Sequence, residues 1–351
     1  MGPAAILLPE WLAGTRAARA LAFAGAFFVC IFTAGALAIT LLGSHADAGA
    51  VILDLAAPPS PAPAPVAPPA AASLIPGAAP VTKPLYAGKA LIADPALVEN
   101  TPEGPLPHIA DDGRAPMQAY AAPAPVSDKP KIAIVVSGLG LSAKATQAAL
   151  NGLPAAVTLG FAPYASDVGD WTAKARAAGH ELLLEIPMEP FDFPDSDPGP
   201  HTLRAGQEES ANIPRLTWAL TRFTGYAGVT NLLGQRFLSD SDALAPALTY
   251  LARRGLYFFD NGSATQSVAP LVAEQAGAAL VQSGVTLDTI QSALEIDRRL
   301  SELEAAARAH GSAVGTAFLY PVSVARIAAW AKGLAARGFV LVPVSAILPK
   351  K

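Results

Sequence analysis

The segment that decides the fold runs from Lys131 to Ala143 and reads KIAIVVSGLGLSA. It opens with a run of β-branched and apolar residues, Ile132–Val136, which predicts a strand. Gly138 and Gly140 then interrupt the run before a stretch with helical spacing. A strand, a tight turn and a helix in this order form the repeating unit of a sheet whose strands run parallel.

The same unit recurs along the rest of the chain. The predicted strands are Ile132–Val136, Val157–Phe161, Leu182–Ile186, Tyr226–Asn231, Tyr257–Asp260, Ala279–Gln282, Ala313–Phe318 and Phe339–Val344. Amphipathic segments such as Leu287–His310 separate most of them, and Gly179, Gly255, Gly311 and Gly338 are expected to end helices in the left-handed conformation. About eight units in about 220 residues predict an α/β fold, a deformed TIM-like (β/α) barrel, with a doubly wound sheet as the alternative. In both folds the functional side chains follow the strands.

An apolar segment near the N-terminus predicts a membrane anchor. Residues 21–42 read LAFAGAFFVCIFTAGALAITLL and carry no charge, which is enough for a helix that crosses a bilayer. Arg16 and Arg19 precede this segment and Asp47 follows it. The positive-inside rule then predicts a cytoplasmic N-terminus (1–20), a transmembrane helix (21–43) in the inner (cytoplasmic) membrane, and a periplasmic remainder. A cleaved signal peptide is the alternative.

The region between the anchor and the first strand is rich in proline. Residues 58–130 hold 18 of the chain's 33 prolines. Residues 44–84 are rich in Pro and Ala and are predicted to be a disordered linker. Residues 85–130 contain more apolar side chains, such as Leu97 and Leu106, and are predicted to be an extended arm that packs on the domain at 131–351. Disorder of this arm is the alternative.

Composition and motifs exclude several classes of protein. The net charge is −4 and no basic run occurs, so we expect no binding of nucleic acid. The single cysteine, Cys30, excludes an intramolecular disulfide and a cysteine zinc site. Gly138-x-Gly140-x-x-Ala143 matches a dinucleotide fingerprint, but the second strand ends at Phe161 without the acidic residue such a site needs, so no cofactor is predicted.

Metal binding is not predicted either. None of the five histidines follows a predicted strand, and no H-x₃-H spacing exists. A weak Mg²⁺ or Ca²⁺ site made of carboxylates alone is the alternative.

Polar residues follow the later strands. The candidate catalytic residues are Glu185, Asp260 and Asp288, since carboxylates at strand ends suit acid–base chemistry. The candidate substrate-binding residues are Ser137, Glu189, Asn231, Arg236, Asn261, Ser263 and Tyr320. This ring of amides, hydroxyls and carboxylates suits hydrogen bonding to a sugar.

The order of several motifs resembles one family. The runs are IAIVVSGLG, VTLGFAPYA, AGHELLLEIPMEP, DPGPHTL, GYAGVTNLLGQRF, RGLYFFDNGS and LVPVSAI. Across residues 131–348 they resemble the divergent polysaccharide deacetylase family. The resemblance implies a deformed α/β barrel of the carbohydrate-esterase kind. In the related active deacetylases an Asp–His–His triad holds the metal, and an Asp and a His act as base and acid.

The sequence departs from that pattern at nearly every such position. The usual Asp-Asp falls on Ser137–Gly138, and the histidine before the PMEP run falls on Glu185. The Asn-His pair falls on Asn231–Leu232, and the late Gly-His-Pro falls on Leu319–Pro321. We therefore expect the fold without metal-dependent deacetylation, because the metal that would activate water lacks its ligands.

These inferences predict an exported, membrane-anchored protein of carbohydrate or cell-envelope metabolism. It is expected to bind a glycan, a peptidoglycan-related ligand or a cell-envelope protein. One alternative is an active carbohydrate hydrolase with a rearranged carboxylate site, which needs two carboxylates about 5–10 Å apart across one pocket. Another is a non-enzymatic envelope scaffold, with the barrel mouth filled by Leu232 and Tyr320.

Overall fold

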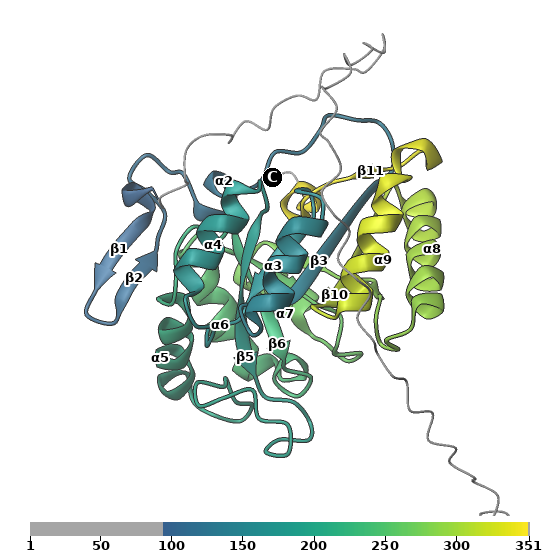
Figure 1. Ribbon diagram of the computed structural model, residues 1–351. Helices are drawn as coiled ribbons and strands as arrows, with labels where there is room; N and C mark the ends of the chain where they lie inside the picture. Colours follow the sequence, from purple (N-terminus) through teal and green to yellow (C-terminus); the bar gives the residue numbers. More distant parts are fainter. Residues whose placement is uncertain (1–93, 350–351) are drawn as a thin grey trace, which may run out of the picture. The chain divides into compact units, whose positions relative to one another are not determined.

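The computed structural model describes residues 94–349, which belong to one compact unit (Figure 1). The predicted transmembrane helix (21–43) and linker (44–84) lie outside the described residues. Within 94–349, no helix is both long and apolar enough to cross a membrane.

A parallel sheet forms the centre of the unit. Its strands, in spatial order, are β8 (Leu280–Gln282), β7 (Tyr257–Asp260), β6 (Gly228–Leu233), β5 (Leu182–Met188), β4 (Thr158–Phe161), β3 (Lys131–Leu139), β10 (Ser312–Phe318) and β9 (Val285–Thr286). The short strand β11 (Val340–Leu341) pairs with the first two residues of β3. Each of the eight predicted strands falls on an observed one, and β9, only two residues long, is additional.

The two edges of the sheet meet in one segment of chain. Only Ser283 and Gly284 separate β8 from β9. Ser283 N donates to Asp260 O on one edge (2.8 Å), and Gly284 N donates to Val314 O on the other (3.0 Å). The sheet is therefore curled as in a TIM-like barrel. In it β3 lies between β4, which follows it in the sequence, and β10, which comes from near the end of the domain. The alternative of a doubly wound open sheet does not fit this strand order.

Helices follow most strands and cover the outside of the sheet (Figure 1). They are α3 (Ala143–Gly152), α4 (Val168–Ala177), α5 (Glu209–Leu220), α6 (Ser241–Arg253), α7 (Ala269–Ala276), α8 (Ala293–His310) and α9 (Pro321–Lys332). Polar side chains start several of them; the Ser142 and Ser292 hydroxyls, for example, accept backbone N–H groups at the starts of α3 and α8. The predicted glycines Gly179, Gly255, Gly311 and Gly338 all have positive φ, which confirms their role at helix ends.

Alternation along the strands divides the core into two parts. On β3, Ile132, Ile134 and Val136 belong to the larger cluster, which includes the buried side chains of the helices. Ala133 and Val135 belong to a second cluster inside the curl of the sheet. Because side chains alternate between faces, Ser137 continues the inner row of β3. By the same rule Glu185 continues the inner row of β5, which contains Leu183.

The residues before β3 pack against the domain. They form a hairpin of β1 (Val98–Thr101) and β2 (Gly104–Pro107) and a short helix α2 (Pro116–Ala119). Leu97, Leu106 and Tyr120 are buried. Arg176 of α4 donates to Tyr120 O (2.7 Å), and Ala122 N donates to the buried carboxylate of Glu181 (3.1 Å). Residues 94–122 are thus attached at several points.

Candidate functional site

The inner row of side chains turns polar near the carboxyl ends of the strands. Ser137 on β3, Glu185 on β5 and Thr230 on β6 are all buried there. Glu185 and Thr230 are paired in register on neighbouring strands, so their side chains share one face of the sheet. These three residues, which we call the inner polar cluster, occupy the mouth of the barrel, where active sites of this architecture lie.

Glu185 has no exposed surface. One carboxyl oxygen, Oε1, accepts a hydrogen bond from Gly138 N, and the other, Oε2, has no hydrogen-bond partner among the described residues. Burial raises the pKa of Glu185 to about 8, against the lowering effect of the Gly138 N–H. The side chain is therefore mainly a neutral carboxylic acid at pH 7, able to donate a proton in a hydrogen bond.

Glycines make room for this carboxyl group. A Cβ atom on Gly160 of β4 would lie 3.1 Å from both Glu185 Oε1 and Ser137 Oγ. Gly138 has φ +89°, which a residue with a side chain rarely adopts, and its N–H points at Glu185. The Ser137 and Thr230 hydroxyl oxygens lack hydrogen-bond partners within residues 94–349. Buried polar atoms without partners are rare, and each residue of the inner polar cluster contributes one of them.

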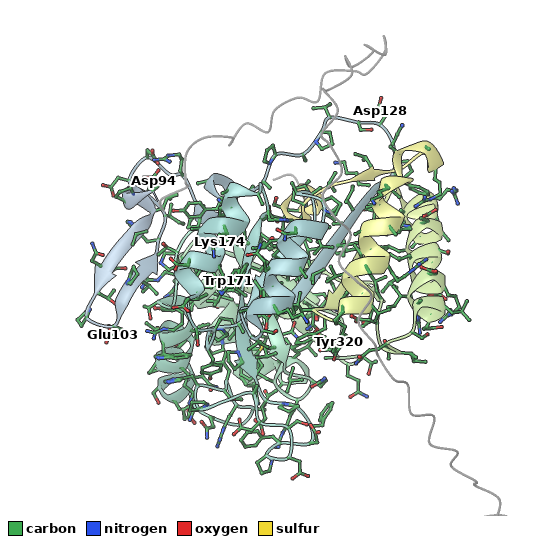
Figure 2. The ribbon with its side chains drawn as sticks, viewed as in Figure 1. Asp94, Glu103, Asp128, Trp171, Lys174 and Tyr320 are labelled. Atoms are coloured by element: carbon green, nitrogen blue, oxygen red, sulfur yellow. The ribbon has the colours of Figure 1, made fainter. Side chains whose placement is uncertain are left out.

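Aromatic rings lie at the mouth beside this cluster. A Cβ on Gly138 would come within 2.5 Å of the Phe318 ring, so that ring packs directly on the glycine. Tyr320 packs on Phe318, with ring centroids 5.1 Å apart and the rings tilted by 49° (Tyr320 is labelled in Figure 2). Both rings are only partly buried, as is Leu232. Phe318 and Tyr320 therefore pack over the Gly138 side of the inner polar cluster.

The predicted asparagines bind each other. Asn231 Nδ2 donates to Asn261 Oδ1 (2.9 Å), and Asn261 N donates to Asn231 Oδ1 (3.0 Å). Asn261 Nδ2 also donates to Asn231 O (3.0 Å), and Asn231 Nδ2 lies 3.2 Å from Ser263 Oγ. The structure brings these three residues together, but most of their polar atoms hold the ends of β6 and β7 in place. Of these three residues, Ser263 is the one that is exposed to solvent.

Glu189 and Arg236 form an ion pair. Arg236 Nη1 donates to Glu189 Oε1 (3.1 Å), and Ala205 N donates to Glu189 Oε2 (2.8 Å). Glu189 is buried, whereas 53% of the Arg236 side chain is exposed. The pair joins the loop after β5 to the loop after β6, and only the arginine is available to a ligand.

Asp260 and Asp288 are separate from the inner polar cluster. Asp260 follows the inward-facing Phe259 and so points to the opposite side of the sheet, where it accepts bonds from Ser267 Oγ (2.7 Å) and Gln282 Nε2 (2.9 Å). Asp288 accepts bonds from Phe318 N (2.8 Å) and Ser323 Oγ (2.7 Å). Burial raises the pKa of Asp288, while these two bonds lower it. Both carboxylates hold local structure.

The donor atoms at the mouth do not fit a zinc-type metal. Within 94–349, no three His, Cys, Asp or Glu side chains gather closely enough to hold a metal ion. His180 is buried with Nδ1 2.8 Å from Val157 O, and the His201 ring stacks on Trp218 with centroids 3.7 Å apart. The mouth offers one carboxyl group and two hydroxyls, without the nitrogen ligands that such a metal prefers.

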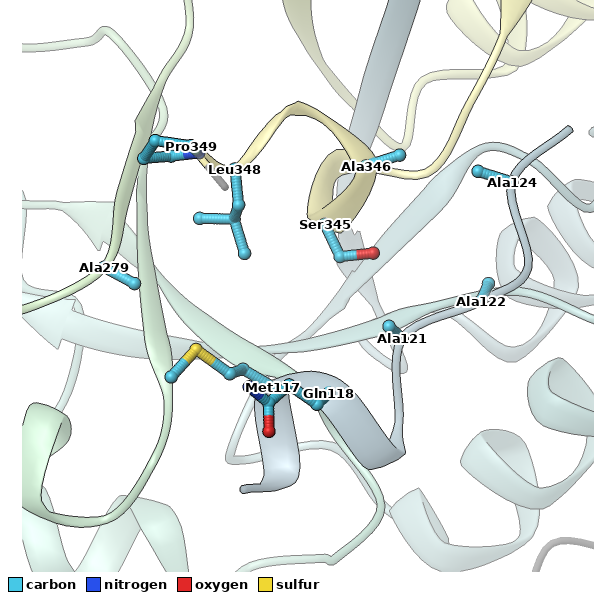
Figure 3. A pocket seen from close by; sticks show the side chains of 10 residues that line it. All are labelled: Met117, Gln118, Ala121, Ala122, Ala124, Ala279, Ser345, Ala346, Leu348 and Pro349. Atoms are coloured by element: carbon cyan, nitrogen blue, oxygen red, sulfur yellow. The ribbon is translucent and has the colours of Figure 1, made fainter. Parts of the chain in front are cut away.

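A hollow lies at the opposite end of the strands. A cavity of about 440 Å³ lies between α2, the residues after it and the end of the chain (Figure 3). Its lining is mostly small and apolar, with Ala122, Ala279 and Leu348 among its residues, and none of the lining side chains is titratable. Nearby, Ser345 donates to Glu181 through both its N–H and its hydroxyl. This end of the barrel is built to hold the arm and the chain end.

The sequence did not single out three residues at the mouth, namely Gly160, Thr230 and Phe318. Alternation of side chains along β6 places Thr230 on the inner face beside Glu185, but only once the register of β6 against β5 is known. Gly160 lies in a strand interior, where glycine often marks close approach of another group.

Comparison with known proteins identifies one family and several relatives. Residues 134–348 match the family described as divergent polysaccharide deacetylase. An uncharacterized protein of Haemophilus influenzae is 24% identical over 204 residues, which cover 58% of this chain and 72% of that protein. The uncharacterized protein YibQ of Escherichia coli is 26% identical over 195 residues, 55% of this chain and 60% of YibQ. The crystal structure of an uncharacterized protein from Agrobacterium tumefaciens is 42% identical with a TM-score of 0.68, and the match covers 70% of this chain and 99% of that one.

Proposed function

The chain belongs to the divergent polysaccharide deacetylase family. We propose that it is a member that binds an envelope glycan or protein without metal-dependent hydrolysis. One observation carries the proposal. At the position where the resemblance places the histidine before the PMEP run stands Glu185, fully buried and hydrogen-bonded to the backbone of Gly138.

The chemistry of the mouth supports binding over hydrolysis. A hydrolase of this architecture needs a metal-bound water or a charged base in contact with substrate. Here the one carboxyl group of the inner polar cluster, that of Glu185, is mainly protonated at neutral pH, because burial raises its pKa to about 8. A neutral carboxylic acid and two hydroxyls without partners suit hydrogen bonding to hydroxyl or amide groups. Such groups occur on both glycans and peptides.

The alternative of a rearranged carboxylate hydrolase has less support. It needs two carboxylates facing each other across one pocket. Glu189 is in an ion pair with Arg236, and Asp260 and Asp288 accept bonds from their own neighbourhoods. Of the four candidate carboxylates, Glu185 alone keeps a buried oxygen without a partner.

The proposal includes the site of action. The apolar, uncharged residues 21–43 support a single-pass anchor in the inner membrane, and the arginines before them support a periplasmic domain. The proline-rich residues 44–84 would let the domain reach away from the membrane. An anchored binder of this kind belongs to carbohydrate or cell-envelope metabolism.

Metal content and glycan binding test the proposal together. The full-length protein, purified in detergent, is analysed for bound metal by mass spectrometry and titrated with zinc and cobalt by calorimetry. The same preparation is then titrated with acetylated chito-oligosaccharides and with soluble peptidoglycan fragments. We expect no metal at one ion per chain, and a saturable signal with at least one of these glycans.

A variant identifies the site of binding. Thr230→Val removes one hydroxyl of the inner polar cluster at nearly constant volume and should weaken glycan binding. The matched control is Thr249→Val on α6, because the Thr249 hydroxyl donates to Ala245 O of its own helix. One tightly bound metal per chain in the wild type would overturn the proposal.

A further inference from the structure

Large apolar side chains gather at the same end of the domain as the barrel mouth. Eight of them are exposed among residues 94–349, and six follow the carboxyl ends of strands. These six are Leu141, Tyr164, Phe191, Leu271, Ile290 and Leu294. Single exposed apolar residues are ordinary on a soluble surface, whereas a gathering on one face marks an interaction site. We call these residues, with the loops and the first turns of α7 and α8 that hold them, the rim surface.

Contacts between the loops make much of the rim surface continuous. Gly140, beside Leu141, packs so closely on Ala165 that a Cβ there would lie 2.3 Å from the alanine Cβ. His201 N, in the loop after β5, donates to Tyr164 Oη (3.1 Å). Gly206 N in that loop donates to Asp240 Oδ2, in the loop after β6 (3.2 Å). The loops after β3, β4, β5 and β6 therefore form one surface, at the lower end of the domain in Figure 1.

The charge of this surface is net negative, although the exposed Arg236 in the loop after β6 also lies on it. The loop after β5, residues 189–208, holds five carboxylates and one arginine. Its Asp192, Asp195 and Asp197 are in no ion pair within the described part of the chain, whereas its Arg204 lies over the Phe193 ring (4.5 Å). Asp167 and Asp240 add carboxylates in the adjoining loops. For comparison, the net charge of the whole chain is −4.

Apolar side chains set among carboxylates fit one class of partner. An anionic glycan or an anionic lipid surface would be repelled by the aspartates. A neutral glycan gains little from exposed leucine and isoleucine. A protein segment that carries lysine or arginine on one face and apolar side chains on the other satisfies both features. From this complementarity we propose that the rim surface binds a basic, amphipathic segment of another protein.

The proposal deepens the proposed function and rests on it, because it names the partner class that a non-hydrolytic domain of this family would hold. It goes beyond the inner polar cluster, since the rim side chains are exposed and lie on the loops and on the first turns of α7 and α8.

A synthetic helical peptide of leucine and lysine is the probe for this surface. Its binding to the full-length protein is measured by fluorescence anisotropy at low and at high salt. We expect saturable binding that weakens as salt rises, and no binding of the same peptide with glutamate in place of lysine. Partly deacetylated chito-oligosaccharides, which are cationic but not amphipathic, form a separate arm and should bind at least roughly tenfold more weakly.

Two variants and two controls locate the binding. The charge variant removes three carboxylates of the rim surface and combines Asp192→Asn, Asp195→Asn and Asp197→Asn. The apolar variant removes exposed apolar surface and combines Phe191→Ser and Leu294→Ser. The charge control is Glu103→Gln, Asp111→Asn and Asp128→Asn, all exposed and outside the rim surface; Glu103 and Asp128 are labelled in Figure 2. The apolar control is Val126→Ser, another exposed position outside the rim surface.

We expect each rim variant to lower the peptide affinity roughly tenfold or more and the controls to leave it unchanged. Equal loss in rim and control variants, or no binding by the wild type, would overturn the proposal. So would equal affinity for the cationic glycan. Acetate release is measured on the same preparation, so failure of the proposed function is recognised separately from failure of this surface.

Discussion

At the scale of single residues, Glu185 holds a proton that an exposed glutamate would have lost. Its pKa is raised from 4.5 to about 8 in the folded chain because it is buried. At pH values between 4.5 and about 8, Glu185 keeps its proton in the folded state and releases it in the unfolded state. The free energy of unfolding must therefore fall as pH rises through this window, by at most about 1.4 kcal/mol per pH unit.

We expect Glu185→Gln to remove that dependence. The amide keeps an oxygen for Gly138 N–H but does not titrate, so its stability should vary less between pH 5 and pH 8 than that of the wild type. Urea denaturation at several pH values measures this difference. Glu103→Gln, at an exposed position, should leave the slope of the wild type unchanged. Parallel pH profiles for wild type and Glu185→Gln would show that Glu185 is ionised in the fold.

Gly160 is the second residue on which the inner polar cluster depends. Gly160→Ala places a Cβ 3.1 Å from Glu185 Oε1 and Ser137 Oγ, which forces at least one of them to move. Overpacking of this kind should lower the free energy of unfolding by about 1–3 kcal/mol. Gly169→Ala, in a helix with no atom within 4 Å of the new Cβ, should be neutral or slightly stabilising. Equal effects of the two substitutions would contradict the packing described at Gly160.

At the scale of elements, the arm before β3 is held by a few buried side chains. Tyr120 is buried, its Oη accepts from Asp94 N (3.1 Å), and the Arg176 guanidinium lies over its ring. Tyr120→Ala should lower the free energy of unfolding by about 3–5 kcal/mol. Hydrogen exchange should become faster across residues 94–122 and change little on β5 and β6. Val126→Ala, at a fully exposed position, is the control, and uniform exchange changes throughout the chain would argue against a locally held arm.

The strands were predictable because each is a short, strongly apolar run. The predicted Tyr257–Asp260 is the observed β7, and the other predicted strands differ from the observed ones mainly at their ends. β9 was missed because two residues form no pattern, and the hairpin was missed because Pro102, Pro105 and Pro107 hide it. Hydrophobic pattern therefore identifies elements well where several residues contribute to it.

The site was harder to predict than the strands. Sequence placed Glu185 and Asp260 alike at strand ends, but their side chains face opposite sides of the sheet. Register decides which side a residue faces, and it depends on pairing between distant segments. Likewise, only the folded chain shows that Asn231 and Asn261 use most of their polar atoms on each other.

At the scale of the whole molecule, the two ends of the barrel have different roles. At one end Glu181 accepts bonds from Ala122 N, Tyr257 Oη and Ser345, and so joins the arm and the chain end to the sheet. The exposed apolar residues and aspartates of the rim surface lie at the other end, which also holds the inner polar cluster. The end that carries hydrolysis in active relatives is thus proposed to have become a binding face.

Acetate release from acetylated chito-oligosaccharides, with zinc or cobalt added to the purified full-length protein, tests the loss of hydrolysis most directly. We expect no release above that of buffer with metal alone, and no difference between wild type and Glu185→Gln. Metal-dependent release by the wild type that Glu185→Gln abolishes would contradict the proposal, because it would make Glu185 part of a working metal site.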